Sequence, residues 1–384
     1  MDKVVIVMPA YNEATNIDPM IHELFDKVFP QIKGAEMHLL VVDDFSPDGT
    51  GDIVKKLSPN YKNLHLIQKQ KEGLGWAYVK GFRYAMDKLG ADAVMEMDAD
   101  FQHPPRFVIP MVEAYLNGAD YCIGSRYIKG GSVPSEWAIS RKMVSYFGNL
   151  FIQLCLLNFK IHDYTTGFRL TKVKGVLDKI DLENLMELKR FAHKTDLLYQ
   201  TLKVSKKTVE VPLEFASREK EKSKFNWIEF VESLKTAIIL GIRDKQRFIK
   251  FGTVGFIGYL INAFTLKILT GLGSPGIVAW SVPVELSIIS NFTLNNIWTF
   301  KAEKITGLFA IIKKFLVFNG TSLGALLIQT VAGLIGDRLL GMGARQITLP
   351  FIIVFLVLPF NYLMYNLVIW KTWKLPAIFG VKKS

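Results

Sequence analysis

Short apolar runs alternate with helical patterns through the first part of the chain. Runs rich in β-branched residues stand at 4–8, 38–42, 64–68 and 94–97, and the segments between them repeat apolar residues at helical spacing. Strands that alternate with helices in this way form a mostly parallel sheet with helices on both faces. The pattern therefore predicts a doubly wound α/β domain over residues 1–225.

The second part of the chain carries much longer apolar stretches. They cover about 251–270, 277–299, 315–336 and 349–370, and each reaches the roughly 20 residues that a bilayer-spanning helix needs. The second stretch contains several asparagines, so we expect it to pack against protein rather than lipid. We predict a four-helix transmembrane domain over 247–384.

Two shorter apolar segments precede these spans. The segment at 144–160 is too short to cross a hydrocarbon core of about 30 Å. The segment at 226–246, which also links the two domains, places apolar residues at helical spacing with charged residues between them. Both fit interfacial helices that lie along a membrane surface, and a buried core helix is the alternative for each.

Composition supports contact with lipid. Hydrophobic residues make up 50% of the 384-residue chain, more than a soluble enzyme requires. The formal net charge of +12 suits an anionic membrane surface, phosphorylated substrates or nucleic acid, but no nucleic-acid motif is visible. Cys122 and Cys155 lack metal-ligand spacing, so we expect buried free thiols.

Lysine and arginine residues predict the orientation in the membrane. Those that flank the apolar stretches fall mostly on one side, and the richer side is cytoplasmic. That side carries Arg243, Arg247, Lys250, Lys301, Lys304, Lys313, Lys314, Lys371, Lys374, Lys382 and Lys383, against Arg338 and Arg345 on the other. The first residues also lack the features of a signal peptide. We expect a multi-pass protein of the cell membrane with its first domain in the cytoplasm.

Acidic residues follow three of the predicted strands. Because open α/β sheets bind ligands at the carboxyl ends of their strands, we expect one ligand to span these acids. After the fourth strand, Asp98, Asp100 and Gln102 are two apart, and in an extended chain they face the same way. Their oxygens suit Mg²⁺ or Mn²⁺ that also holds substrate phosphates. The spacing alone leaves a solvated acidic turn as the alternative.

Six motifs occur together in the order found in one enzyme family. They are PAYNE at 9–13, DDFSPDGT at 43–50, GLG at 73–75, DAD at 98–100, GSR at 124–126 and DYTTGFR at 163–169. Residues 1 to about 230 therefore resemble family 2 glycosyltransferases of the GT-A fold, and among them the polyprenyl-phosphate mannosyltransferases, or dolichol-phosphate mannose synthases. The apolar second half, especially NFTLNNIWTF at 291–300, resembles the GtrA-like four-helix membrane domains.

The resemblance implies an activity and the residues that carry it. Such enzymes transfer mannose from GDP-mannose to dolichyl or another polyprenyl phosphate, with inversion at the anomeric carbon. The implied nucleotide-sugar contacts are Pro9, Tyr11, Glu13, Val42, Asp44, Asp98, Ala99, Arg126, Arg218 and Lys224. The implied ligands of a divalent metal, Mg²⁺ or Mn²⁺, are Asp100 and Gln102, although many relatives have Ser in place of Gln102.

The residue chemistry agrees with these assignments. The departing diphosphate gains charge as the glycosidic bond breaks, so a metal at Asp100 and the cations Arg126, Arg218 and Lys224 are the expected catalytic groups. A solvated loop is the alternative for Arg218 and Lys224. The phosphate acceptor is already ionised and needs positioning rather than a strong general base. We expect Arg126, Arg141 and Ser145 to bind it, with surface ion pairing as the alternative.

Other activities stay open at this stage. A UDP-glucose-dependent polyprenyl-phosphate glucosyltransferase would share the same motifs. A flippase for lipid-linked sugars with a regulatory soluble half, or a nucleotide-sugar sensor that binds without turnover, belongs to a different class. The chain lacks the Gln-X-X-Arg-Trp motif of processive relatives, which favours one sugar per acceptor.

Overall fold

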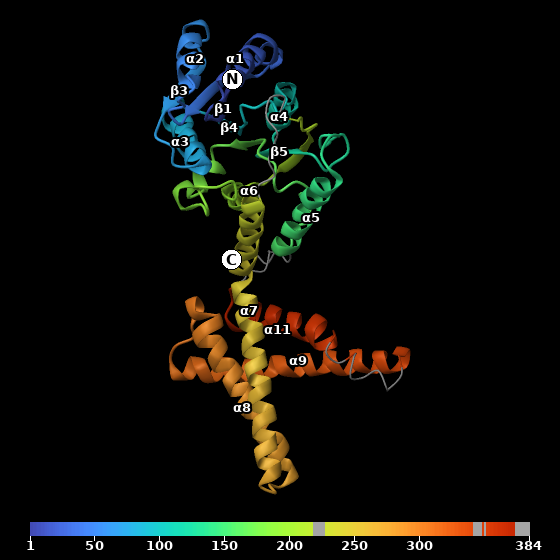
Figure 1. Cartoon of the computed structure of the whole chain (residues 1–384). Helices are drawn as coiled ribbons and strands as arrows, with labels where there is room; N and C mark the ends of the chain where they lie inside the picture. Colours follow the sequence, from blue (N-terminus) through green and yellow to red (C-terminus); the bar gives the residue numbers. More distant parts are fainter. Residues whose placement is uncertain (218–226, 341–347, 349–350, 373–384) are drawn as a thin grey trace. The chain divides into compact units, whose positions relative to one another are not determined.

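The computed structural model describes residues 1–217, 227–340, 348 and 351–372 (Figure 1). The chain divides into two compact units, Met1–Gly241 and Ile242–Ser384. The 45-residue helix α7 (Trp227–Gly271) begins in the first unit and ends in the second. Each unit is described by itself below.

A seven-stranded sheet forms the centre of the first unit. The strands are β1 (Asp2–Ala10), β2 (Ala35–Asp43), β3 (Leu64–Gln68), β4 (Ala93–Glu96), β5 (Tyr121–Ser125), β6 (Arg169–Lys172) and β7 (Thr208–Pro212). Their order is β3-β2-β1-β4-β6-β5-β7. Only β6 runs against its neighbours β4 and β5, whereas the other pairs are parallel. The predicted α/β domain with a mostly parallel sheet is confirmed.

Helices cover both faces of this sheet. They are α1 (Ala14–His22), α2 (Thr50–Leu57), α3 (Leu74–Asp87), α4 (Val108–Leu116), α5 (Ile139–Leu156) and α6 (His193–Val204). Along β1, Val4 and Ile6 pack into a core with α1, α2 and α4, whereas Val5 and Val7 pack into a second core with α3 and α6. This alternation follows from the two-residue period of a strand. Because β1 runs parallel to its neighbours β2 and β4, the carboxyl ends of these three strands lie at one edge of the sheet.

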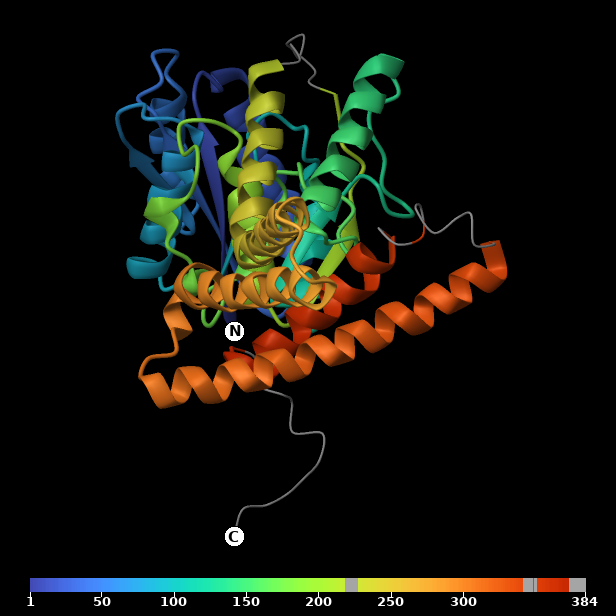
Figure 2. The same ribbon diagram turned by 90° about the horizontal axis from the view of Figure 1, so that it is seen from below.

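The second unit is helical. After α7 come α8 (Gly276–Leu294), η7 (Asn295–Thr299), η8 (Lys301–Glu303), α9 (Leu308–Leu340), η10 (Ile353–Val357), α11 (Leu358–Met364) and η11 (Tyr365–Ile369). Among the described residues, α7 and α9 are long and apolar enough to cross a membrane. Figure 2 shows α9 along its length. Helical segments thus occupy all four predicted stretches, and that all four cross the bilayer stays a prediction. The segment predicted as a separate interfacial helix and linker, 226–246, instead continues without a break into the first predicted span.

Polar residues of the second unit pack against protein, as expected. Asn295 and Asn296 are buried. Asn296 accepts a hydrogen bond from Trp370 Nε1 at 3.1 Å, and its amide donates to the carbonyl of Ile305 at 3.1 Å. The indole of Trp370 also stacks on Phe300, with ring centroids 4.3 Å apart.

Candidate active site

A cavity of about 510 Å³ opens at the carboxyl ends of β1, β2 and β4. Most of the residues predicted for substrate and metal lie on its wall: Pro9, Tyr11, Glu13, Asp44, Asp98, Ala99, Asp100, Gln102, Arg126, Arg141 and Ser145. Val42 does not, because its side chain alternates into the core beneath the sheet and is fully buried. Arg218 and Lys224 lie outside the described residues.

The loop after β2 holds the loop after β1 in place. Asp48 Oδ2 accepts a hydrogen bond from the backbone of Ala14 at 2.9 Å, and Thr50 Oγ1 accepts one from the backbone of Glu13 at 3.0 Å. These N–H groups stand where α1 begins and have no partner within the helix. The second motif therefore caps the helix that follows the first motif, which fixes Tyr11 and Glu13 at the cavity.

The two aspartates at the end of β2 have different partners. Asp43 accepts hydrogen bonds from Ser46 Oγ at 2.5 Å and from Gln68 Nε2 at 2.9 Å. Asp44 lines the cavity and forms an ion pair with Lys69 at 2.7 Å, in which both side chains are more than nine-tenths buried. Asp43 is thus held by its neighbours within the fold, and Asp44 is the carboxylate of this pair that faces the cavity.

The prediction that an extended chain makes Asp98, Asp100 and Gln102 face the same way was wrong, although all three residues line the cavity. The strand ends at Glu96, and Phe101 takes a left-handed backbone with φ of 61°. The backbone N–H of Gln102 donates to Asp100 Oδ1 at 3.1 Å. A turn, rather than the alternation of an extended chain, therefore brings these oxygens together.

The same turn has the oxygen donors that a divalent cation requires. Among the described residues, no three His, Cys, Asp or Glu side chains form a group that could hold a metal. Mg²⁺ sites in phosphate-binding enzymes commonly use one or two protein carboxylates and complete the shell with substrate phosphates and water. Asp100 with Gln102 fits that kind of site and does not fit a closed cage of protein ligands.

His103 supports the turn and stays neutral. It is 1% exposed, and its Nδ1 accepts a hydrogen bond from the backbone of Asp98 at 3.2 Å. Burial lowers the pKa of His103 to about 4. The imidazole therefore acts as a hydrogen-bond acceptor here and adds no positive charge to the cavity.

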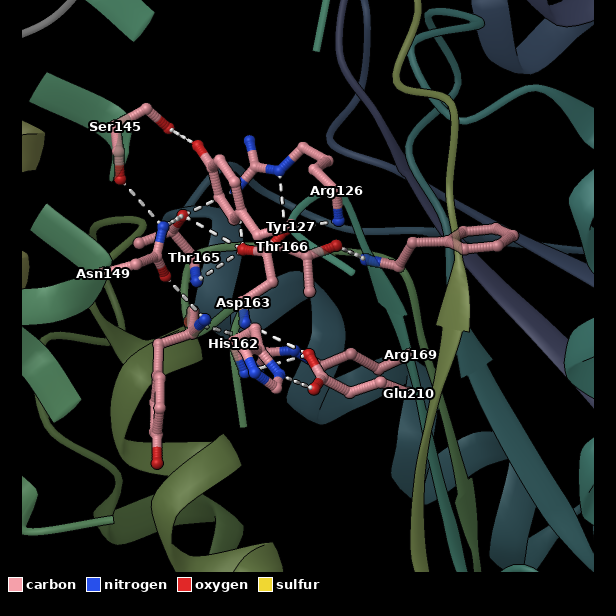
Figure 3. Close-up of polar contacts among 12 residues, drawn as sticks. Arg126, Tyr127, Ser145, Asn149, His162, Asp163, Thr165, Thr166, Arg169 and Glu210 are labelled. Atoms are coloured by element: carbon pink, nitrogen blue, oxygen red, sulfur yellow. Dashed lines mark hydrogen bonds and ion pairs between the residues drawn. The ribbon is translucent and has the colours of Figure 1, made fainter. Parts of the chain in front are cut away.

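Arg126 is held by a buried carboxylate (Figure 3). Its Nε and Nη2 donate to the two oxygens of Asp163 at 2.7 Å each, and Nη2 also donates to Thr165 at 2.6 Å. Arg126 is 8% exposed and Asp163 is fully buried. Burial alone would raise the pKa of Asp163, but the charge and hydrogen bonds of Arg126 outweigh it and hold the pKa below its usual value. The guanidinium therefore has one defined orientation at the cavity wall.

Helix α5 is attached to the same loop. Asn149 accepts a hydrogen bond from the backbone of Tyr164 at 2.7 Å and donates to Thr165 at 3.2 Å (Figure 3). One turn earlier on α5, Ser145 shares a hydrogen bond of 2.5 Å with the hydroxyl of Tyr127. Ser145 and Arg126 are thus tied into one network and both line the cavity; that they bind an acceptor phosphate stays a prediction.

Helices α5 and α7 contribute apolar residues to the cavity wall. They are Gly148 and Ile152 from α5 and Phe230 and Leu234 from α7, beside the polar Glu229 and Ser233 of α7. The helices approach so closely that a Cβ on Gly148 would lie 2.8 Å from the ring of Phe230. Many large apolar side chains of these helices are exposed: Ile139, Met143, Tyr146, Phe147, Leu150, Phe151, Leu154, Trp227, Ile228, Val231 and Ile238.

Three lysines at or behind the cavity were missed by the sequence analysis. Lys69 pairs with Asp44, Lys71 lies 3.2 Å from the ring centroid of Tyr11, and the fully buried Lys194 lies 3.6 Å from Asp98. No local motif distinguishes them from solvated lysines. The proximity of Lys69 and Lys71 to the GLG motif at 73–75 was the one signal available.

Comparison with known proteins identifies the family. Residues 5–178 match the family Glycosyl transferase family 2, and residues 250–370 match the GtrA/DPMS, transmembrane domain. Dolichol-phosphate mannosyltransferase of Pyrococcus furiosus is 35% identical over 320 residues, which cover 82% of this chain and 85% of the relative. The chain therefore belongs to glycosyl transferase family 2, and it is an enzyme of that class with a transmembrane domain.

Further relatives place it more narrowly within the family. Undecaprenyl-phosphate mannosyltransferase of Micrococcus luteus is 36% identical over 225 residues, covering 58% of this chain and 88% of the relative. Polyprenol monophosphomannose synthase of Mycolicibacterium smegmatis is 35% identical over 245 residues, covering 63% and 88%. The similarity over most of the chain is thus to the dolichol-phosphate mannosyltransferase group, and the first unit is its GT-A-like domain.

Proposed function

We propose that this enzyme transfers mannose from GDP-mannose to dolichyl or a related polyprenyl phosphate, giving the lipid phosphate mannose and GDP. One observation carries the proposal. A single cavity is lined by the carboxylates Asp44, Asp98 and Asp100, by Arg126 with Ser145, and by apolar residues of α5 and α7. A nucleotide diphosphate sugar, a phosphate and a lipid chain need these three environments. The names of the relatives supply the sugar and the type of acceptor.

The donor occupies the acidic side in this proposal. The Asp44 carboxylate accepts hydrogen bonds, which suits the ring N–H groups of guanine, and Tyr11 offers an aromatic face beside it. Pro9, Glu13, Asp98 and Ala99 complete the donor wall. Asp100 and Gln102 would hold Mg²⁺ or Mn²⁺. When bound, the cation neutralises charge on the diphosphate as the bond to the sugar breaks.

The acceptor phosphate lies against Arg126, Arg141 and Ser145 in this proposal. Its ionised oxygen attacks the anomeric carbon as the bond to the diphosphate oxygen breaks, so a single displacement inverts that carbon. No proton has to be removed from the nucleophile. Arg126 and Arg141 orient the phosphate and reduce its repulsion from the diphosphate, and the walls exclude water. Arg218 and Lys224 are assigned to the departing diphosphate.

The lipid portion follows the apolar wall toward the membrane. The exposed apolar side chains of α5 and the start of α7 suit an interfacial position, and four spans anchor the chain. The distribution of lysine and arginine supports a cytoplasmic position for the catalytic unit.

The test is turnover by the purified full-length chain in detergent. The protein is incubated with labelled GDP-mannose or UDP-glucose and a short polyprenyl phosphate, with Mg²⁺, Mn²⁺ or a chelator. We expect metal-dependent product from GDP-mannose, with Asp100→Asn as the inactive control. Product from UDP-glucose alone would show the glucosyltransferase instead. Metal-dependent donor binding without any product would show a sensor.

A further inference from the structure

The proposed chemistry gives no role to the buried cation Lys194. Lys194, the second residue of α6, has a side chain that is 0% exposed. Its Nζ lies 3.6 Å from Asp98 Oδ1 and 3.5 Å from the hydroxyl of Tyr78. Removing an ammonium from water is costly unless nearby groups compensate for the lost hydration. The carboxylate of Asp98 is the ion-pair partner that compensates here, and the buried carboxylate of Glu96 also interacts with Lys194.

The hydroxyl of Tyr78 acts on the same oxygen of Asp98. It donates a hydrogen bond to Oδ1 at 3.0 Å. Burial raises the pKa of Tyr78, so the phenol keeps its proton and remains a donor. Asp98 itself is 32% exposed and lines the cavity. One oxygen of this carboxylate is therefore held from behind by two groups, while the side chain still reaches the ligand space.

Gly167 is what allows the ammonium to lie there. A Cβ added to Gly167 would lie 2.2 Å from Lys194 Nζ, which is closer than any real contact. Gly167 also lines the cavity, so the cation lies directly behind a residue of the cavity wall. The glycine of the motif at 163–169 and the lysine of α6 thus form one unit, although they are on different elements.

We propose that Lys194 is a positioning residue for the donor: together with Tyr78 it fixes the carboxylate of Asp98 as a hydrogen-bond acceptor for hydroxyl groups of the nucleotide sugar. The metal is then left to Asp100 and Gln102. If this position served packing alone, a buried apolar side chain would fill the same space at lower cost. This inference rests on the proposed function only in taking Asp98 as a donor contact.

The test is a double-mutant cycle on donor binding by the full-length chain in detergent, with Mn²⁺ present and no acceptor. Lys194→Met is expected to weaken GDP-mannose binding by about 10- to 100-fold, the range for a hydrogen bond or pair that involves a charge. In an Asp98→Asn background, where no carboxylate remains to be held, Lys194→Met is expected to change affinity by less than about 3-fold. A structural role predicts the same loss in both backgrounds, and that result would overturn the proposal.

Two further variants keep the test decisive where Lys194→Met does not fold. Tyr78→Phe removes only the hydroxyl and is expected to weaken donor binding by about 3- to 10-fold, again only while Asp98 is present. Gly167→Ala displaces the ammonium and should act in the same direction. Wild-type affinity in both variants would refute the assignment.

Matched controls separate this effect from general damage. Lys203→Met removes another lysine of α6, one that lies over the ring of Tyr199 at 4.4 Å, and Tyr115→Phe removes a tyrosine hydroxyl that donates to Asp2 at 2.8 Å. Both are expected to bind donor normally. If the wild-type chain binds UDP-glucose and not GDP-mannose, the proposed function fails, and the same cycle run with UDP-glucose still decides the role of Lys194.

Discussion

Asp163→Asn is expected to destabilise the catalytic unit and to impair use of the acceptor. Asp163 is fully buried and compensates the charge of Arg126, itself 8% exposed, through hydrogen bonds of 2.7, 2.7 and 3.1 Å. Breaking a buried pair by removing one charge typically costs about 3–5 kcal/mol, and asparagine keeps an acceptor oxygen, so we expect about 3 kcal/mol. For a unit of this size that is roughly 6–12 °C in Tm.

The assays are thermal unfolding in detergent and kinetics with varied acceptor. A guanidinium released from Asp163 no longer lies in one orientation, so kcat/KM for the polyprenyl phosphate is expected to fall about 100-fold or more, with donor affinity nearly unchanged. Adding Arg126→Met to Asp163→Asn removes the uncompensated charge. This double variant is expected to regain most of the lost stability and none of the activity.

An exposed pair of similar geometry supplies the control. Arg83 and Glu183 form two hydrogen bonds of 2.7 Å, but their side chains are 41% and 45% exposed. Glu183→Gln is expected to cost less than about 1 kcal/mol, because water screens and replaces the pair. If Asp163→Asn melts at the wild-type temperature with an unchanged acceptor KM, the argument from burial is refuted.

Four other predictions test separate parts of the proposal. Asp100→Asn should abolish transfer and weaken metal-dependent donor binding, at a barrier cost of several kcal/mol, and near-normal turnover would remove the metal assignment. Arg218→Ala and Lys224→Ala should lower kcat more than donor affinity, whereas equal losses in both measurements would make these residues docking groups. Truncation after Asp244 should preserve transfer to a short, dispersed acceptor in mild detergent but reduce it on a long acceptor in vesicles. A truncated protein that binds donor and transfers nothing would show that the membrane helices complete the acceptor site. Burial lowers the pKa of His193 to about 3, so the unfolded chain binds a proton that the folded chain does not, and stability should fall as pH drops from about 6.5 toward 3. His193→Gln should flatten that dependence in unfolding measured against pH, and an unchanged slope would contradict it.

The sequence alone determined the main elements of the catalytic unit and the edge of the sheet at which the cavity lies. Period-two and helical patterns reflect burial of one face or both, and they are visible locally, so strands such as β3 (Leu64–Gln68) were predicted correctly. Acids after β1, β2 and β4 converge because parallel strands end at one edge, a rule of topology that needs no coordinates. The order of the family's motifs then indicated the class of enzyme.

The sequence determined the ends of helices and the positions of backbone turns less well. Charged residues between 243 and 250 suggested a break between an interfacial segment and the first span, but α7 continues through them. Lysine, arginine and glutamine are good helix formers, so a run of them changes the surface of a helix without ending it. The backbone turn at Phe101 was missed for a similar reason, since nothing in the residue type announces a left-handed conformation.

Only the tertiary structure decided which polar and charged side chains act together. Lys194 and Tyr78 are 116 residues apart, and Arg126 and Asp163 are 37 apart, yet each pair meets beside the cavity. A lysine in a helix reads the same whether it is solvated or buried against a carboxylate. The difference lies in which loop packs over it, and here Gly167 leaves room for an ammonium where any other residue would place a side chain. Packing between distant segments sets these partners, and a pattern along the chain carries no record of it.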